Sequence, residues 1–274
     1  MALALGMTTV PAQEFTVHHA PGGVSDIVSR TIAQQTPWTV VNRPGGGGRV
    51  AVNHLLNNNA VMLATVNQIF VNNALSKTIP DRSDELEILA LVAYMGNTLV
   101  CNDQVPTWAD LINKPIRLGY GGQGSNEHLA TEILVRSFNI NATMVPYAQG
   151  GAKTLQDLLG RHIDCVFFNT PTVKPHLNNG QLHTLITTAT WSTRAGKQWP
   201  FDSALALVTA KNNPNKAAIA QQVTVLMQKS ALREQLQQLG LTAVLRNDPK
   251  AISDLAQQNQ RLKQYIELNN LVLE

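Results

Sequence analysis

Short apolar runs alternate with amphipathic, helix-like segments along the first hundred residues. Strands are expected over residues 14–20, 38–42, 60–66 and, as one or two strands, 87–102. Between them, the spacing of apolar positions predicts helices over residues 26–35 and from residue 49 onward. This β-α-β-α-β order indicates a mostly parallel sheet with helices on both faces.

The second half of the chain repeats the scheme. Strands are expected over residues 115–120, 142–147, 163–169, 182–189 and 204–210, and helices over residues 107–113, 121–138 and 151–162. Two long helices close the chain: one spans residues 216–239 with Gly240 as its C-cap, and the other begins at Asp248 and Pro249. The pattern therefore predicts an α/β protein of two similar units, each with a glycine-rich loop between a strand and a helix.

Composition narrows the class of protein. The chain has 274 residues, of which 44% are apolar and only 14% charged, and its formal net charge is +3 without any basic block longer than two residues. A nucleic-acid-binding protein would gather Lys and Arg on one face, so nucleic acid is not expected as a partner. No run of 18 apolar residues is present, so no membrane span is expected.

Two further features are the cysteines and the N-terminus. Cys101 and Cys165 lie in apolar runs and are expected to be buried free thiols, although their spacing leaves a disulfide open. Residues 1–13 are apolar and then small, with a signal-peptidase-like Val10-Pro11-Ala12, and lack a basic start. We interpret them as the remnant of an export signal, with a frayed N-terminus as the alternative.

Several kinds of chemistry can be weighed at the glycine loops. G-Y-G-G-Q-G (119–124) matches the dinucleotide pattern, but no acidic residue follows the next strand to hold a ribose. R-P-G-G-G-G-R-V (43–50) lacks the Gly-Lys-Ser/Thr ending of a P-loop and is expected to be a flexible turn. No nucleophile elbow or zinc spacing is present, and His18 and His19, adjacent on a strand, would point to opposite faces. No catalytic residue, metal or cofactor is therefore predicted.

Anion binding without covalent chemistry fits the loops better. A helix N-terminus offers unpaired N–H groups and partial positive charge, and glycine lets a carboxylate approach the backbone. Two such loops on two domains would hold a molecule with a carboxylate at each end, or a carboxylate and another polar group.

Five motifs, in order, resemble those of one known family. A-P-G-G-V-S-D-I-V-S-R (20–30) is similar to that family's A-P-G-G-x-x-D-x-x-A-R, and V-V-N-R-P-G-G-G-G (40–48) to its V-E-N-R-P-G-A-G-G. The remaining three are G-Q-G-S-N-E-H-L-A (122–130), V-P-Y-A-Q-G-G-A (145–152) and L-L-G-R-H-I-D (158–164). The chain thus resembles the Bug-type, TctC-like extracytoplasmic solute receptors of tripartite tricarboxylate transporters.

This resemblance implies a two-domain periplasmic-binding-protein (Venus flytrap, type II-like) architecture. Domain 1 would comprise residues 14–102 plus 207–274, and domain 2 residues 103–206. A small carboxylate or related metabolite would bind between loops 20–26 and 119–128 and pass to a membrane permease. The protein would be periplasmic in a Gram-negative bacterium, monomeric and not an enzyme.

Specific residues follow from the loops and the resemblance. Gly22 and Gly23 are expected to offer N–H groups to the ligand, Asp26 to stabilise the first helical turn, and His128 to brace its loop. Ser125 either donates its hydroxyl to the ligand or caps the helix. His19, where the family usually has Phe, is expected to set specificity, as an imidazolium paired with a carboxylate or as a packed neutral ring. The full expected set is His19, Pro21, Gly22, Gly23, Val24, Asp26, Asn67, Gln68, Tyr120, Gln123, Gly124, Ser125, His128 and Asn169.

Two other functions stay open at this point. The same fold could act as a sensor that passes ligand state to a signalling partner. A nucleotide-binding enzyme could use the loop 119–124. The sequence does not choose among mono- or dicarboxylates, amides and neutral solutes as ligand.

Overall fold

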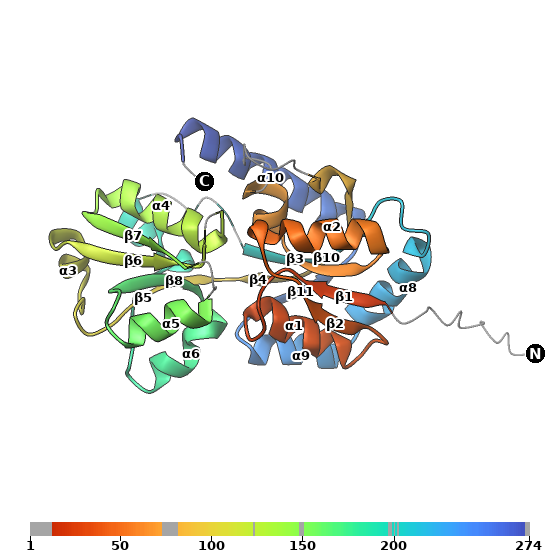
Figure 1. The fold of residues 1–274 in the computed structure, drawn as a ribbon, viewed down its shortest axis with the longest axis horizontal. Coiled ribbons are helices and arrows are strands. Elements are labelled where there is room, and N and C mark those ends of the chain that lie inside the picture. Colours follow the sequence, from red (N-terminus) through yellow and green to blue (C-terminus); the bar gives the residue numbers. More distant parts are fainter. Residues whose placement is uncertain are drawn as a thin grey trace, which may run out of the picture.

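The computed structural model describes residues 13–72, 82–122, 124–147, 151–196, 199, 201 and 203–271. They form two lobes, each built on its own sheet and flanked by helices (Figure 1). The two-domain α/β architecture expected from the sequence is confirmed. Among the described residues, no helix is both long and apolar enough to cross a membrane.

The first sheet has six strands in the order β11-β4-β10-β3-β1-β2. Its strands are β1 (Glu14–Val17), β2 (Thr39–Asn42), β3 (Val61–Thr65), β4 (Leu86–Met95), β10 (Ser203–Ala210) and β11 (Thr242–Arg246). β1 is parallel to β2 and β3, whereas β10 runs antiparallel to β3 and β4, and β11 antiparallel to β4. The sheet is therefore mixed, and the expectation of a mostly parallel sheet was wrong, because the chain leaves the first domain after β4 and returns in the opposite direction through β10.

Helices cover both faces of this sheet. Successive side chains of a strand pack alternately into the hydrophobic core on one face and into the core on the other. Val61 and Leu63 of β3 pack with α1 (Val24–Ala33), α8 (Lys216–Met227) and α9 (Ser230–Gln238). Met62 and Ala64, one residue out of phase, pack with α2 (Arg49–Asn58) and the first half of α10 (Pro249–Leu268). Successive side chains of a strand point to opposite faces, so a strand buried on both faces must be apolar throughout, as β3 is.

The second sheet has five strands in the order β7-β6-β8-β5-β9. Its strands are β5 (Asn97–Cys101), β6 (Ile116–Tyr120), β7 (Ala142–Pro146), β8 (Cys165–Asn169) and β9 (His183–Thr187). The helices of this lobe are α3 (Trp108–Asn113), α4 (Asn126–Phe138), α5 (Gly151–Leu159), α6 (Thr170–Asn178) and α7 (Ser192–Ala195). β6 is parallel to β7 and β8, and β5 is antiparallel to β8 and β9, so this sheet is mixed as well.

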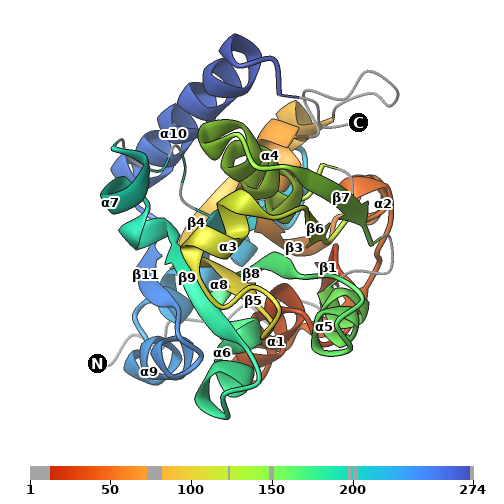
Figure 2. The same cartoon turned by 90° about the vertical axis from the view of Figure 1, so that its left-hand side faces the viewer.

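The C-terminal helix α10 joins the two lobes. Leu255 near its start is buried in a core of the first lobe, whereas Leu262 and Ile266 are buried with strands of the second. Figure 1 shows α10 running across both lobes, and Figure 2 shows it beside α4. The helix is thus a third link between the lobes, besides the connections β4–β5 and β9–β10.

Cys101 and Cys165 form a disulfide, so the expectation of free thiols was wrong. The two residues are direct register partners on the antiparallel strands β5 and β8, and their Cα atoms lie 4.1 Å apart. Both side chains are fully buried. Their separation of 64 residues hides this pairing from the sequence, because it depends on which strands become neighbours.

Other details also differ from the sequence-based expectations. The helix expected over residues 216–239 is two helices, because Lys229 adopts an extended backbone between them. β11 and α6 were not predicted. The stretch 87–102 divides at Gly96 into β4 and β5, and β5, which the predicted boundary placed in domain 1, pairs in the second sheet. The exact division into domains stays a proposal.

Candidate functional site

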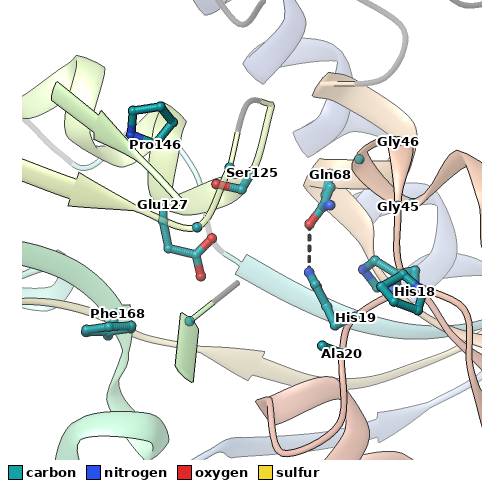
Figure 3. Close-up of a pocket in the computed structure, with 16 residues that line it drawn as sticks. His18, His19, Ala20, Gly45, Gly46, Gln68, Ser125, Glu127, Pro146 and Phe168 are labelled. Carbon is teal, nitrogen blue, oxygen red and sulfur yellow. Dashed lines mark hydrogen bonds between the residues drawn. The ribbon is translucent and has the colours of Figure 1, made fainter. Parts of the chain in front are cut away.

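A cavity of about 380 Å³ lies between the two lobes, among loops that follow strands of both sheets. The first lobe contributes segments after β1, β2 and β3, and the second contributes segments from β6, β7, β8 and the starts of α4 and α5 (Figure 3). The lining residues are His18, His19, Ala20, Pro44, Gly45, Gly46, Gly47, Gly48, Gln68, Gly121, Gly122, Ser125, Glu127, Pro146, Gly151 and Phe168. Ligands of α/β folds bind at the carboxyl ends of parallel strands, which makes this cavity the candidate site.

The glycine loop after β2 is part of the cavity wall, although its sequence alone did not indicate a role in the site. Residues 45–48 all have positive φ, and residues 46–48 form a 3-10 turn that leads into α2. A Cβ on Gly48 would lie 2.6 Å from Cδ1 of Ile69 and 3.4 Å from Cδ2 of His18. The expected flexible turn is instead a tightly folded loop whose backbone forms part of the cavity wall. At Gly48, the close approach of Ile69 and His18 leaves room only for glycine.

His19 is held at both ring nitrogens. Nε2 lies 3.1 Å from Oε1 of Gln68, and Nδ1 lies 3.1 Å from Oγ of Ser25. The amide oxygen of Gln68 can only accept, so Nε2 carries a proton, and in a neutral ring Nδ1 accepts from the hydroxyl of Ser25. Burial lowers the pKa of His19 from its usual value of 6.5, although Glu127 and Gln68 act in the opposite direction. The structure therefore supports the neutral ring over the imidazolium.

His18 lies beside His19 rather than on the opposite face, because β1 already ends at Val17. The centroids of the two rings are 4.0 Å apart with a tilt of 42°. Burial holds the pKa of His18 well below its usual range, and the neighbouring His19 adds to this effect. The expected opposite orientation of the two rings was thus wrong, but within the described residues no group of three His, Cys, Asp or Glu side chains could hold a metal.

Ser125 and His128 organise the start of α4. The hydroxyl oxygen of Ser125 accepts a hydrogen bond from the backbone N–H of His128 over 3.0 Å, so Ser125 is the helix N-cap. Ser125 also lines the cavity, and its own hydroxyl proton is not consumed by the cap, so its two expected roles are compatible. Nδ1 of His128 accepts from the N–H of Gly124 over 3.2 Å, and its ring stacks on Tyr120 at 4.4 Å. His128 therefore braces the loop, as expected.

The loop before α1 is used mainly to start that helix. The N–H of Gly22 donates to Oδ2 of Asp26 over 3.0 Å, and Asp26 also accepts from Arg30 and Asn42. Burial raises the pKa of Asp26, but these hydrogen bonds outweigh it and lower the pKa overall. Gly23 is the N-cap of α1. None of Pro21, Gly22, Gly23, Val24 and Asp26 is among the described residues that line the cavity, so their contact with a ligand stays a prediction.

The other expected residues fall into three groups. Gln68 lines the cavity, whereas Asn67, Tyr120, Gly124 and Asn169 lie outside its described lining. Asn67 is buried, and its Oδ1 has no hydrogen-bond partner within the described part of the chain. Gln123 lies outside the described residues.

Glu127 lines the cavity and was not foreseen. It is in the first turn of α4, and Figure 3 shows its carboxylate pointing into the space that His19 and Gln68 face from the other lobe. An acid in the first turn of a helix is usually explained by the helix dipole, so the sequence offers no separate signal for it. Phe168 and Pro146 complete this wall and were also missed.

Solved structures with the same overall fold are known. The periplasmic binding protein BugD superposes with a TM-score of 0.81 at 19% identity, covering 95% of this chain and 98% of that one. Rpa4515 of R. palustris with adipate gives 0.82 at 19% identity, covering 93% and 96%. MatC (Rpa3494) of Rhodopseudomonas palustris with bound malate gives 0.77 at 18% identity, covering 92% and 98%. The fold is therefore that of the two-domain periplasmic binding proteins.

Sequence comparison identifies the family. The model of the tripartite tricarboxylate transporter family receptor matches residues 23–271, and the chain belongs to this family. A UPF0065 protein of Bordetella pertussis is 24% identical over 187 residues, which cover 62% of this chain and 58% of that protein. The match thus spans little more than half of the Bordetella protein.

Proposed function

We propose that this protein is an extracytoplasmic receptor that captures a small carboxylate or related metabolite between its two lobes and delivers it to a membrane permease. The observation that carries the proposal is the cavity between the lobes, whose wall combines glycine-rich backbone from residues 45–48 and 121–122 with polar side chains of both domains. Glycine backbone lets a carboxylate approach N–H donors closely, without a charged side chain.

The relatives support a carboxylate. Adipate and malate are the ligands of two proteins that share the fold. An oxidising compartment is consistent with the disulfide between Cys101 and Cys165, because such bonds persist mainly outside the cytosol.

Binding without catalysis fits the described cavity wall. The hydroxyl that is bonded to His19 belongs to Ser25, which is buried and lies outside the described lining, so this pair does not present a nucleophile to the cavity. The described residues also offer no group of metal ligands. We therefore propose a binding protein rather than an enzyme.

A thermal-unfolding screen tests the proposal. The protein would be heated with monocarboxylates, dicarboxylates, amino carboxylates, NAD and ATP, each in large excess. A ligand present at one hundred times its Kd stabilises the folded state by about 2.7 kcal/mol. We expect stabilisation by at least one carboxylate and none by either nucleotide. Stabilisation by a nucleotide alone would favour the nucleotide-binding enzyme instead.

Delivery to a permease needs a separate test. A deletion of the gene in its own organism should abolish uptake of the ligand found in the screen, and the intact gene should restore it. Normal uptake, with a lost transcriptional response to the ligand, would favour a sensor.

A further inference from the structure

Glu127 places a carboxylate on the second-lobe wall of the cavity. Its Oε1 accepts a long hydrogen bond of 3.4 Å from Nδ2 of Asn169, and its Oε2 lies over Gly121, where a Cβ would be 3.5 Å from it. Ser125, two residues earlier, lines the same wall. The start of α4 therefore fixes the position of an acidic group in the cavity.

No cation of the described chain balances this carboxylate. The described lining includes no Lys or Arg, and none of the ion pairs among the described residues involves Glu127. His18 and His19 face it from the first lobe, and burial favours the neutral form of both rings. The carboxylate of Glu127 therefore faces two neutral imidazole rings across the cavity and has no positive charge among the described residues to balance it.

A second acceptor lies beside it. Nδ2 of Asn169 donates to Glu127, and this hydrogen bond fixes the orientation of the whole side-chain amide, including its oxygen Oδ1. This Oδ1 is buried and has no donor within the described residues. Asn169 lies outside the described lining of the cavity, so Glu127 is the acceptor on the wall, and the unpaired amide oxygen lies directly behind it on the group that is bonded to Glu127. An N–H-rich group of a ligand would satisfy the carboxylate.

We infer that the ligand is a small amino carboxylate, whose ammonium group faces Glu127 and whose carboxylate lies toward the glycine loop 45–48. This inference rests on the proposed function, since it assumes that the cavity binds a carboxylate. A dicarboxylate of equal length would place its second negative charge against Glu127 in a partly dehydrated site, where like charges repel strongly.

Isothermal titration calorimetry on matched pairs tests the inference. The pairs are 3-aminopropanoate and succinate, 4-aminobutanoate and glutarate, and 5-aminopentanoate and adipate, each pair having the same number of methylene groups. We expect at least one amino carboxylate to bind the unmodified protein at least tenfold more tightly than its partner. Glu127→Gln, which keeps the shape and removes the charge, should reduce this preference at least tenfold.

Glu234→Gln is the matched control, because it removes a charge from an exposed position on α9. This variant should keep the preference of the unmodified protein. Equal or tighter binding of the dicarboxylates by the unmodified protein would overturn the inference while supporting the proposed function, and so would a preference that Glu127→Gln leaves unchanged. If no compound of either kind binds, the inference fails, and the broader thermal-unfolding screen of carboxylates decides the proposed function.

Should Glu127→Gln fail to fold, as judged by circular dichroism, the pairs measured on the unmodified protein decide the question.

Discussion

Nε2 of His19 donates a hydrogen bond of 3.1 Å to Oε1 of Gln68, and this bond joins the segment after β1 to the turn after β3. The other ring nitrogen accepts from Ser25, whose Oγ lies 3.3 Å from Oγ1 of Thr65. One imidazole thus orders polar groups from three segments of the first lobe. It shapes the cavity wall through Gln68 rather than by carrying a charge.

His19→Phe should therefore change ligand preference and leave the fold intact. The ring volume is kept, but Gln68 loses its donor and its amide can turn toward the ligand. We expect the relative affinities within a panel of carboxylates to change by about tenfold, which corresponds to about 1.4 kcal/mol. The loss of two partly buried hydrogen bonds should lower the free energy of unfolding by about 1–3 kcal/mol.

Calorimetric titration with the panel, at several pH values, checks this prediction. His162→Phe, at an exposed position after α5, is the control, because it makes the same replacement of histidine by phenylalanine at a residue that does not line the cavity. Identical ligand profiles and pH curves for His19→Phe and the unmodified protein would rule out a role of His19 in specificity.

Local signals explain which elements the sequence predicted. Thr107 forms a capping box with Asp110, and Asp248 caps α10 with Pro249 in the first turn; both signals lie within four residues of the feature they specify. By contrast, α6 contains Pro175 and carries a second proline in its first turn, so its sequence is more typical of a loop. Neighbouring elements stabilise α6, and such contacts are not visible in its own residues.

The residues of the site divide in the same way, into those that local sequence signals indicate and those that depend on contacts between distant parts of the chain. The sequence indicates the loops at the carboxyl ends of strands, and His19, Gln68 and Ser125 do line the cavity. Glu127 was missed because its position within a helical turn does not reveal that a second lobe faces it. The bond between Cys101 and Cys165 was missed for a related reason, because strand order is a long-range property.

Loss of the Cys101–Cys165 disulfide should lower the stability of the second lobe substantially. Its 64-residue separation restricts the unfolded chain, and loop-closure entropy gives a contribution of about 4 kcal/mol, with about 2–4 kcal/mol typical of measured cases. We expect urea to unfold the protein at a clearly lower concentration in the presence of dithiothreitol. The double variant Cys101→Ala, Cys165→Ala should be as unstable without reductant and indifferent to its addition. Equal unfolding midpoints with and without reductant would contradict the prediction.

Gly48→Ala should destabilise the protein more than Gly22→Ala. Both glycines have positive φ, +100° at Gly48 and +86° at Gly22, so alanine is strained by about 1 kcal/mol at either position. Only at Gly48 does the new methyl group also meet the buried Ile69, at 2.6 Å, which adds about 1–3 kcal/mol. At Gly22 nothing lies within 4 Å.

Urea unfolding of Gly48→Ala and Gly22→Ala separates the loss of stability due to backbone strain from the loss due to the contact between the new methyl group and Ile69. Equal losses of stability in the two variants would mean that the loop 45–48 moves away from Ile69 at little cost.

Stability should fall as the pH drops from 7.5 to 5.5, because three histidines with lowered pKa values, the buried His18 and His128 and the partly buried His19, resist protonation. Burial lowers the pKa values of His18, His19 and His128 below 6.5 in the folded protein. The unfolded chain takes up these protons near pH 6.5, so the stabilisation is complete above that pH and is lost below it, toward the folded pKa values. Each histidine contributes a slope of at most about 1.4 kcal/mol per pH unit.

Urea unfolding at intervals of half a pH unit measures this slope. Glu14 and Asp26 also have lowered pKa values, but their usual values are 4.5 and 3.8, so their stabilisation is lost only below the range measured. His19→Phe and His128→Gln should each reduce the slope by the contribution of one histidine, even though both variants are less stable at pH 7.5. A free energy of unfolding that stays constant or rises between pH 7.5 and 5.5 would show that these three rings are not held neutral.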